Sequence, residues 1–276
     1  MSLPATSTTH ASIMMRNGAR PAHRMVAEET AVAMVYDGTS HAVMMATPDD
    51  LEDFAYGFAL TERLITKVDQ LREVEVETQA LGIELRGWLD PARSRAFGAR
   101  NRRMAGATGC GMCGLDSLRE AVRPVPQVPA GRAMTAATVH AALASLAPLQ
   151  RLHSLTRATH AAGFFRHDSG LAALREDVGR HNALDKLIGA LARAGEDTAD
   201  GVLVLTSRIS VELVQKAAIA GFPVVVAVSA PTALALRVAE EAGITVVAAA
   251  RHGGFEIFSH QRRIVADPRG DVPARL

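Results

Sequence analysis

The sequence is poor in cysteine, in aromatic residues and in net charge. It has two cysteines among 276 residues, aromatic residues make up 4%, and the formal net charge is +1. The core must therefore consist mostly of Ala, Val, Leu and Ile, and the chain is long enough to bury a sizeable core in one large domain or two smaller ones. A net charge near zero argues neither for nor against nucleic acid, and we expect no nucleic-acid partner.

Long apolar runs are also missing. Residues 1–25 are polar and mixed, without the continuous apolar core of a secretory signal, and we expect a mobile tail over residues 1–24. Residues 224–250 are the richest in apolar side chains, but Pro231 and charged residues interrupt them, so no stretch reaches the roughly 18 apolar residues of a membrane helix. We expect a cytoplasmic protein with no membrane partner. In the reducing cytoplasm, a cysteine pair is more often catalytic or metal-binding than a structural disulfide.

The first part of the chain combines strand and helix patterns. Residues 30–46 are two apolar runs around an Asp-Gly dipeptide, which predicts a β-hairpin. Thr47 is a good N-cap for a helix whose apolar face continues over residues 51–65. Residues 72–89 alternate like two strands. Together these patterns predict an α+β lobe over residues 25–123.

An arginine-rich segment then leads to the cysteines. Residues 91–115 contain five arginines and no acid, and they end in a glycine-rich loop that holds Cys110 and Cys113. The three prolines that follow, within residues 124–131, indicate a linker between two lobes.

The second lobe, over residues 132–276, alternates apolar strands with helices. Continuous Val-rich strands in such an alternation imply a parallel sheet covered on both faces. The predicted strands are 170–174, 202–205, 224–228 and 244–249, and the predicted helices are 135–146, 183–195, 211–220 and 232–242.

Ligands of such sheets bind beyond the carboxyl ends of the strands. Three loops are predicted there: Ser207-Arg208, Ser229 to Pro231, and Arg251 to Gly254. The first two precede helices, whose free N–H groups can bind an anion.

The cysteine pair has several possible roles. A structural zinc site needs four ligands, so histidines or a second chain would have to complete it. A thioredoxin-type redox pair normally follows a strand in a βαβ unit, which this glycine-rich loop does not resemble. A nucleophilic thiolate that carries a group such as a persulfide sulfur fits better, because nearby arginines lower a thiol pKa and a loop can reach two partners. Two inert thiols are disfavoured by the same surroundings.

Other polar residues remain open between structural and functional roles. The segment Arg175 to Lys186 crowds charged and amide side chains at a strand-to-helix turn, and helix capping and ion pairing explain it as well as a binding site does. His160 is a lone histidine in a stretch of small residues, and such a histidine is more often structural than a ligand. His260 ends an alternating strand, where it could bind a ligand or simply end the strand.

Several motifs, in this order over roughly residues 25–265, resemble the formate dehydrogenase accessory sulfurtransferases (FdhD). They are Cys110 to Cys113, Arg175 to Lys186, Ser207 to Ser210 with Glu212 to Lys216, Ser229 to Pro231, and Phe255 to His260. The twelve-residue match from Arg175 to Lys186 is the most specific of them.

The resemblance implies a sulfurtransferase. Such a protein takes sulfur from a cysteine desulfurase as a cysteine persulfide and passes it to the molybdenum of a bis(molybdopterin guanine dinucleotide) cofactor, which formate dehydrogenase requires. It implies that Cys110 carries the persulfide, that Cys113 assists, and that the cofactor is a bound client with no permanent metal. The implied cofactor-binding residues are Phe255, Glu256, Ile257, Phe258, Ser259 and His260.

The resemblance also implies a homodimer and an α/β fold, with a cytidine-deaminase-like C-terminal lobe and a smaller α+β N-terminal lobe. Deaminase chemistry itself is not expected, because Gly109 rather than proline precedes Cys110 and His160 lacks the following glutamate of a His-x-Glu motif. Two alternatives stay open: a non-catalytic chaperone of the molybdenum cofactor, and a zinc site shared across a dimer.

Overall fold

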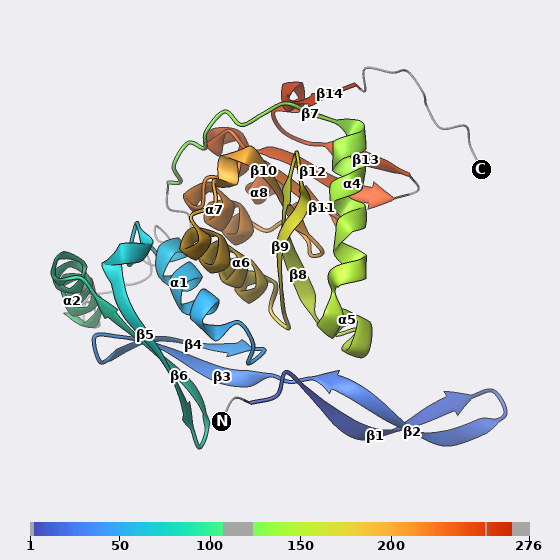
Figure 1. The fold of residues 1–276 in the computed structure, drawn as a ribbon, viewed down its shortest axis with the longest axis horizontal. Coiled ribbons are helices and arrows are strands. Elements are labelled where there is room, and N and C mark those ends of the chain that lie inside the picture. The colour runs from blue at the N-terminus through green and yellow to red at the C-terminus, as the bar shows by residue number, and fades with distance from the viewer. Residues whose placement is uncertain (1–2, 107–123, 252, 267–276) are drawn as a thin grey trace. The chain divides into compact units, whose positions relative to one another are not determined.

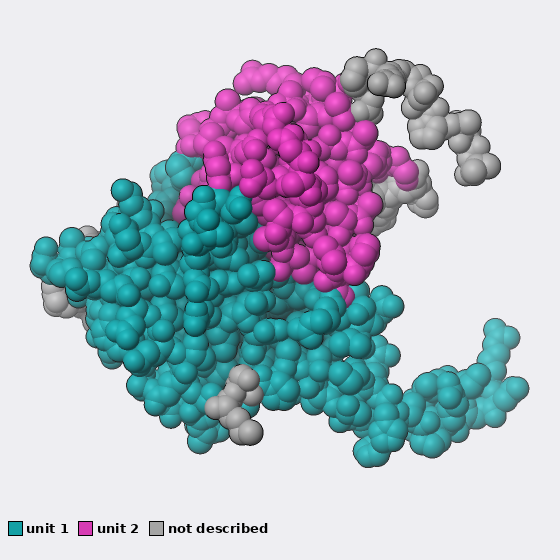
Figure 2. Space-filling view, in the orientation of Figure 1, with its two compact units in different colours: residues 1–126, 151–160, 175–196 teal, residues 127–150, 161–174, 197–276 magenta. Residues whose placement is uncertain are grey.

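The chain folds into two compact units of mixed α/β structure, seen in a computed structural model that describes residues 3–106, 124–251 and 253–266. Unit 1 comprises residues 1–126, 151–160 and 175–196, and unit 2 comprises residues 127–150, 161–174 and 197–276 (Figure 2). The contiguous lobes expected from the sequence, 25–123 and 132–276, differ from this division, because two segments of the second half belong to unit 1.

A long β-hairpin begins unit 1, where the sequence suggests a mobile tail over residues 1–24. Strands β1 (Thr6–Met15) and β2 (Gly18–Ala27) are antiparallel and pair only with each other (Figure 1). Met15 pairs with Gly18, so Arg16 and Asn17 form a two-residue turn. Neither turn residue has a positive φ, whereas Gly18, the first residue of β2, has φ 130°, a conformation that favours glycine.

A four-stranded sheet follows, in the order β4-β3-β6-β5. At the β3–β4 turn, Asp37 (φ 48°) and Gly38 (φ 74°) both have positive φ, as a two-residue hairpin with a primed turn requires. One face of the sheet packs against α1 in an apolar core that includes Met34, Phe54 and Leu85. The strands are β3 (Thr30–Tyr36), β4 (Thr39–Ala46), β5 (Leu71–Gln79) and β6 (Gly82–Leu89).

Helix α1 (Leu51–Thr61) begins later than its sequence pattern predicts. The residue at its N-cap is Asp50, which has left-handed backbone angles and makes no side-chain cap hydrogen bond. Thr47, the expected cap, is fully buried and instead donates and accepts hydrogen bonds in a polar network described below.

The arginine-rich segment before the cysteines is helical. Helix α2 (Pro91–Gly106) contains all five arginines of this segment. Asp90 Oδ1 accepts hydrogen bonds from the N–H groups of Ala92 and Arg93, and these bonds lower the pKa of Asp90. The 3₁₀ turn η1 (Val68–Gln70) contacts α2, because Arg93 Nε donates to Gln70 Oε1 over 3.0 Å.

Two helices from the second half of the sequence complete unit 1. Helices α5 (Arg151–Thr156) and α6 (Arg180–Ala194) lie in it, and α6 crosses α1 at very short range. A Cβ atom on Gly57 would lie 1.7 Å from the carbonyl oxygen of Asp185, and one on Gly189 would lie 1.8 Å from that of Asp53. Only glycine fits at these two positions.

Unit 2 contains most of a six-stranded sheet in the order β13-β12-β11-β10-β8-β9 (Figure 1). The central strands β10, β11 and β12 are parallel, as predicted, whereas β8 and β13 run antiparallel to their neighbours. The strands are β8 (His160–Arg166), β9 (Gly170–Asp177), β10 (Gly201–Leu205), β11 (Val224–Ala227), β12 (Thr245–Arg251) and β13 (Gly254–Ile257). Every residue of β10 and β11 is buried, so the centre of the sheet is covered on both faces.

The helices of unit 2 begin and end close to their predicted positions. The N-cap side chains of Thr135 and Thr232 accept hydrogen bonds from backbone N–H groups in the first turns of α4 and α8, and Gly243 ends α8 with φ 79°. The helices are α4 (Ala136–Leu146), α7 (Val211–Ile219) and α8 (Ala233–Ala242), with short 3₁₀ turns η2 (Ala147–Leu149), η3 (Thr198–Asp200) and η4 (Gln261–Arg263). Strands β7 (Met134–Thr135) and β14 (Ile264–Val265) form a small parallel pair.

No helix within the described residues is long and apolar enough to span a membrane.

Candidate functional site

The cysteine pair lies outside the described part of the chain. Cys110 and Cys113 follow α2 in sequence, so the prediction that they are the reactive residues rests on the sequence. Among the described residues, no group of three or more His, Cys, Asp and Glu side chains is arranged to hold a metal ion.

The stretch from Phe255 to His260 has two structural roles. In β13, Phe255 and Ile257 pack against the core of unit 2 and Glu256 is exposed between them. The Phe255 ring also lies 5.2 Å from the ring of His140. These three residues therefore follow the alternation of a half-buried strand, and the two apolar ones stabilise the core.

Ser259 and His260 hold this stretch against the beginning of β12. Ser259 is 3% exposed, and its Oγ donates to the carbonyl oxygen of Ile244 over 2.7 Å and accepts from the N–H of Val246 over 3.0 Å. The carbonyl oxygen of His260 accepts a hydrogen bond from Thr245 Oγ1. Ser259 is fully engaged in structure, whereas the side chain of His260 remains at the surface of the fold.

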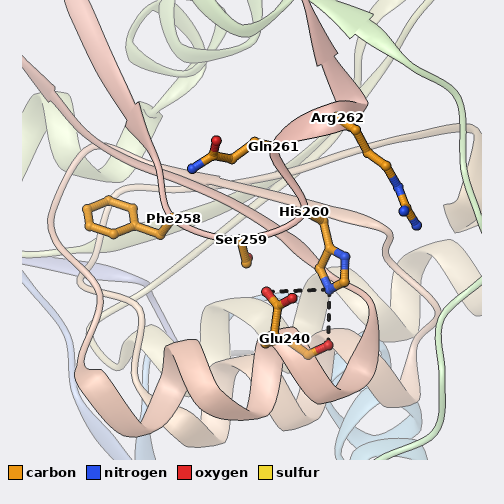
Figure 3. Close-up of a pocket in the computed structure, with 6 residues that line it drawn as sticks. All are labelled: Glu240, Phe258, Ser259, His260, Gln261 and Arg262. Carbon is orange, nitrogen blue, oxygen red and sulfur yellow. Dashed lines mark hydrogen bonds and ion pairs between the residues drawn. The ribbon is translucent and has the colours of Figure 1, made fainter.

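A surface depression opens beside Phe258 and His260 (Figure 3). Its volume is about 430 Å³, and it is lined by Glu240, Phe258, Ser259, His260, Gln261 and Arg262. His260 Nε2 lies 3.0 Å from the carbonyl oxygen of Glu240 and 3.7 Å from its carboxylate, which orients the imidazole at the edge of the depression. Gln261 and Arg262 are exposed.

A second depression of about 490 Å³ shares His260 and Arg262 with the first. Its other lining residues are Gln127, Val128, Ala130, Gly131, Ala133, Gly243 and Arg263. Arg263 is a structural part of its wall, because its guanidinium donates to three carbonyl oxygens and to Thr245 Oγ1. Burial lowers the pKa of Arg263, and the positive charge of Arg262 adds to this.

Together the two depressions offer an aromatic ring, an imidazole, an amide and the exposed guanidinium of Arg262 along one surface of unit 2. Such groups suit a planar heterocycle joined to phosphate, since Arg262 can pair with phosphate oxygens and Phe258 can contact a ring.

The three loops expected to bind an anion lie at the other end of the strands. The backbone N–H of Ile209 donates to Ala230 and joins the first two loops, and the N–H of Ala249, in β12, donates to Ser229 in the second loop. His252, in the third loop, lies outside the described residues. The three loops follow the carboxyl ends of β10, β11 and β12, whereas Ser259 contacts the amino end of β12. Seven residues of strand span about 20 Å, so the structure separates the two regions that the sequence suggests for one cofactor.

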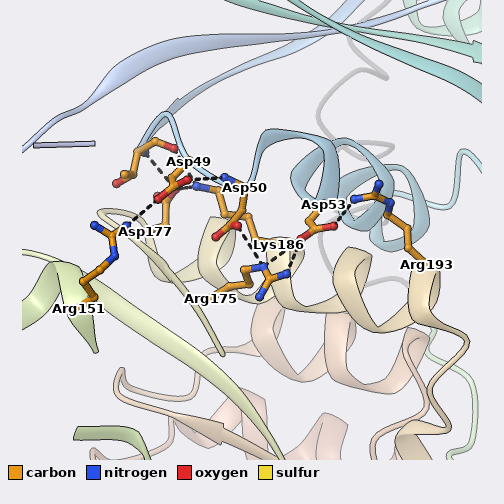
Figure 4. A network of polar contacts seen from close by, with 9 residues as sticks. Asp49, Asp50, Asp53, Arg151, Arg175, Asp177, Lys186 and Arg193 are labelled. Carbon is orange, nitrogen blue, oxygen red and sulfur yellow. Dashed lines mark hydrogen bonds and ion pairs between the residues drawn. The ribbon is translucent and has the colours of Figure 1, made fainter. Parts of the chain in front are cut away.

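The segment Arg175 to Lys186 forms a buried polar network in unit 1 rather than an open site (Figure 4). Asp177 and Lys186 are fully buried and form an ion pair of 2.7 Å. Asp177 also accepts hydrogen bonds from Thr47 N, Gly179 N and Asn182 Nδ2, and Lys186 Nζ donates to the carbonyl oxygen of Thr47. Asp177 and Lys186 therefore join the turn before α1, at Thr47, to α6.

The acidic start of α1 is tied to α6 and its approach in the same way. Arg175 donates to Asp53 Oδ2 over 2.7 Å and lies 3.4 Å from Asp50, and Arg193 pairs with Asp53 and Glu52. Burial raises the pKa of Asp50, although the charge of Arg175 opposes this.

Arg180 and His160 are two further polar residues of this region. Arg180 Nε is buried and has no hydrogen-bond partner among the described residues. The pKa of His160 lies below its ordinary value, first because the ring is partly buried and then because Arg180 is positively charged.

Sequence reasoning missed several residues that the fold brings together. Glu240 registers in the sequence only as a charge that interrupts an apolar segment, and Arg262 lies just beyond the matched stretch. The contact of Glu240 with His260 depends on the antiparallel return of β13 beside β12, which the alternating parallel pattern does not reveal.

The chain is similar to known proteins of one family. The model of the FdhD/NarQ family matches residues 27–265. The sulfur carrier protein FdhD of Brucella abortus is 52% identical over 250 residues, covering 90% of this chain and 93% of the relative, and that of Agrobacterium fabrum is 47% identical over 243 residues, covering 88% and 90%. The crystal structure of a protein described as a formate dehydrogenase accessory protein from Desulfotalea psychrophila has a TM-score of 0.75 at 23% identity, covering 95% of this chain and all of that chain.

Proposed function

Because this chain belongs to the FdhD/NarQ family, we propose that it is a sulfur carrier in the maturation of formate dehydrogenase. The observation that carries the proposal is the high identity to sulfur carrier proteins over nearly the whole chain, together with the two cysteines inside the matched range. A thiol is the group on which a protein carries sulfur reversibly.

The first step is persulfide transfer to Cys110. The Cys110 thiolate attacks the terminal sulfur of a persulfide on a cysteine desulfurase, a new S–S bond forms on Cys110, and the donor cysteine leaves as a thiolate. Five arginines and no acid precede the cysteines between residues 91 and 106, and this positive charge favours the attacking thiolate.

The second step is delivery of the sulfur to a molybdenum cofactor. Attack by Cys113 on the inner sulfur of the Cys110 persulfide releases hydrosulfide and forms a Cys110–Cys113 disulfide, and the two thiols supply the two electrons that reduce the sulfur. A dithiol reductant then restores both thiols. In this role the chain is a sulfurtransferase, and its client is a bis(molybdopterin guanine dinucleotide) cofactor.

Intact mass after incubation with a desulfurase and cysteine tests the first step. We expect wild type and Cys113→Ala to gain the mass of one sulfur atom, and Cys110→Ala to gain none. Loading of Cys110→Ala, or no loading of wild type, would contradict the role given to Cys110.

We place the guanine nucleotide of the client at the depressions beside His260, with Phe258 and Arg262 as its contacts. Calorimetry with GDP at low salt tests this, since phosphate contacts weaken as salt rises. Arg262→Glu should weaken GDP binding at least about tenfold, as the loss of a charge-assisted bond predicts. Arg208→Glu, an exposed change at the carboxyl ends of the strands, is the matched control, and a stronger effect of that variant would place the nucleotide there.

The protein would act in the cytoplasm as a homodimer, with the desulfurase and formate dehydrogenase as partners. The alternation of β10, α7, β11, α8 and β12 supports relating unit 2 to the cytidine deaminases in fold.

If the protein is instead a non-catalytic chaperone, a Cys110→Ser/Cys113→Ser variant will still activate the dehydrogenase. A dimer-shared zinc site would give about half an equivalent of zinc or more per chain on metal analysis.

A further inference from the structure

The β1–β2 hairpin is a part of unit 1 that the proposed sulfur transfer does not use. Nearly all of it precedes residue 27, where the match to the family model begins. Each of its strands has ten residues and pairs only with the other, and an isolated two-stranded hairpin is at best marginally stable in water. A link between the two strands would therefore stabilise it.

Two histidines face each other across these strands. His10 pairs with His23 in the register, so the two side chains lie directly opposite each other on one face of the hairpin. Both are exposed, and their ring centroids lie 4.5 Å apart with an angle of 54° between the planes. Neither imidazole has a hydrogen-bond or ion-pair partner within the described part of the chain, so the ring nitrogens are available to a ligand.

The spacing of the two rings suits one metal ion between them. A Zn–N bond is about 2.0–2.1 Å long, so the ion lies about 3.2 Å from the centroid of each imidazole that binds it. Two such rings have centroids about 4.5–5.2 Å apart when the N–metal–N angle is about 90–110°. The observed 4.5 Å lies in this range, so small side-chain rotations bring one nitrogen of each ring to the same ion.

The face of the hairpin that carries the histidines has no arginine, lysine or carboxylate. Its residues are Thr6, Thr8, His10, Ser12, Met14, Ala19, Pro21, His23, Met25 and Ala27. Arg20 and Arg24 lie on the opposite face, so no fixed positive charge on the histidine face repels a cation. Because neither strand contains a carboxylate, the donors favour an ion that prefers imidazole, such as Zn²⁺, Ni²⁺ or Cu²⁺, over Mg²⁺ or Ca²⁺.

We propose that His10 and His23 bind one divalent transition-metal ion of this class, and that the ion joins the two strands of the hairpin. The two imidazoles supply two ligands, and water completes the coordination, as it does at the open position of a catalytic zinc site. Opening of the hairpin separates the two histidines, so the ion binds the closed hairpin and stabilises it.

Titration calorimetry with ZnCl₂ at about pH 7.5 tests the site on the full chain, since metals bind neutral imidazole. Thiolates also bind zinc, so every protein in the test carries Cys110→Ser/Cys113→Ser, and this double variant is the parent. We expect the parent to bind about one equivalent of Zn²⁺ per chain and no Mg²⁺. His10→Phe and His23→Phe should each weaken zinc binding at least about tenfold, because one imidazole is left while an aromatic pair still joins the strands. His140→Ala, which removes an exposed histidine of α4, should bind zinc like the parent.

Hydrogen exchange of the hairpin amides measures whether the ion joins the strands. At a free Zn²⁺ concentration of about a hundred times Kd, exchange in residues 6–27 of the parent should slow about a hundredfold, because only the closed hairpin binds the ion. Amides of β10, and the hairpin amides of His10→Phe, should exchange at the same rate with and without zinc.

Four results would overturn the proposal: no zinc binding by the parent, binding that both phenylalanine variants retain, half an equivalent per chain, or binding without slower exchange in the hairpin. Half an equivalent would mean a site shared by two chains. Exchange without zinc shows whether each phenylalanine variant keeps the hairpin, and the response of the parent to zinc remains a test even if a variant loses it.

Discussion

Asp177 and Lys186 form a buried ion pair, and we expect its loss to destabilise the protein strongly. Both side chains are fully buried, and each charge has further hydrogen-bond partners. Lys186→Met leaves a buried carboxylate without its counter-charge, so we expect the free energy of unfolding in urea to fall by about 3–5 kcal/mol. Lys67→Met removes an exposed lysine and should change it by less than about 0.5 kcal/mol. Equal effects of the two substitutions would mean that the buried pair adds nothing.

His160 gives the fold a pH dependence of known sign. Its pKa in the folded protein lies below the ordinary 6.5, because of partial burial and then the charge of Arg180. Between the two pKa values the unfolded chain binds the proton and the folded chain does not, so stability is lost as pH falls below about 6.5. His160→Gln should flatten the decline in unfolding free energy between about pH 7.5 and 5.5, whereas the exposed His23→Gln should not. Parallel curves for wild type and His160→Gln would contradict this assignment.

At the scale of elements, the crossing of α1 and α6 requires glycine. A methyl group on Gly57 would lie 1.7 Å from a backbone oxygen, which cannot move aside as a flexible side chain would. We expect Gly57→Ala to destabilise the protein by about 3 kcal/mol or more. Gly195→Ala, at a helix end with φ 67° and open space around it, should cost only about 1–2 kcal/mol. Urea unfolding measures the loss of unfolding free energy in both variants. A smaller loss for Gly57→Ala than for Gly195→Ala would show that the helices can separate to make room for the methyl group.

The sequence predicts elements well where local chemistry decides them. The Asp-Gly turn and the helices predicted over 135–146 and 232–242 lie within a residue or so of where the pattern predicts them, because each depends on neighbours in the chain. Thr47 behaves differently, since its partners are Asp177 and Val178, far away in sequence. For the same reason the pattern could not distinguish a buried network from a site in the segment Arg175 to Lys186.

The candidate site shows the same limit. The resemblance selects Phe255 to His260, but alternation within β13 commits Phe255 and Ile257 to the core and leaves Phe258 and His260 at the surface. Their neighbour Glu240 comes from α8, and only the pairing of β13 with β12 brings it near.

At the scale of the whole molecule, the proline-rich segment 124–131 is a misleading place to divide the chain. It has no helix or strand, and the boundary between the units at residues 126 and 127 lies within it. Yet unit 1 also requires α6, whose Asp185 accepts a hydrogen bond from Thr61 and whose Lys186 closes the buried network.

A fragment of residues 1–126 should therefore fail to fold. Alone it exposes the glycine face of α1 that α6 covers, and it lacks both charged partners of the network, so we expect no cooperative unfolding transition in urea by circular dichroism. Co-expressed with residues 127–276, which supply α6, it should copurify as a folded complex with a cooperative transition. A sigmoidal transition of the isolated fragment would show that the strands and α1 suffice. Copurification with cooperative unfolding, combined with failure of each fragment alone, would show that folding of the first unit depends on chain segments supplied from beyond residue 150.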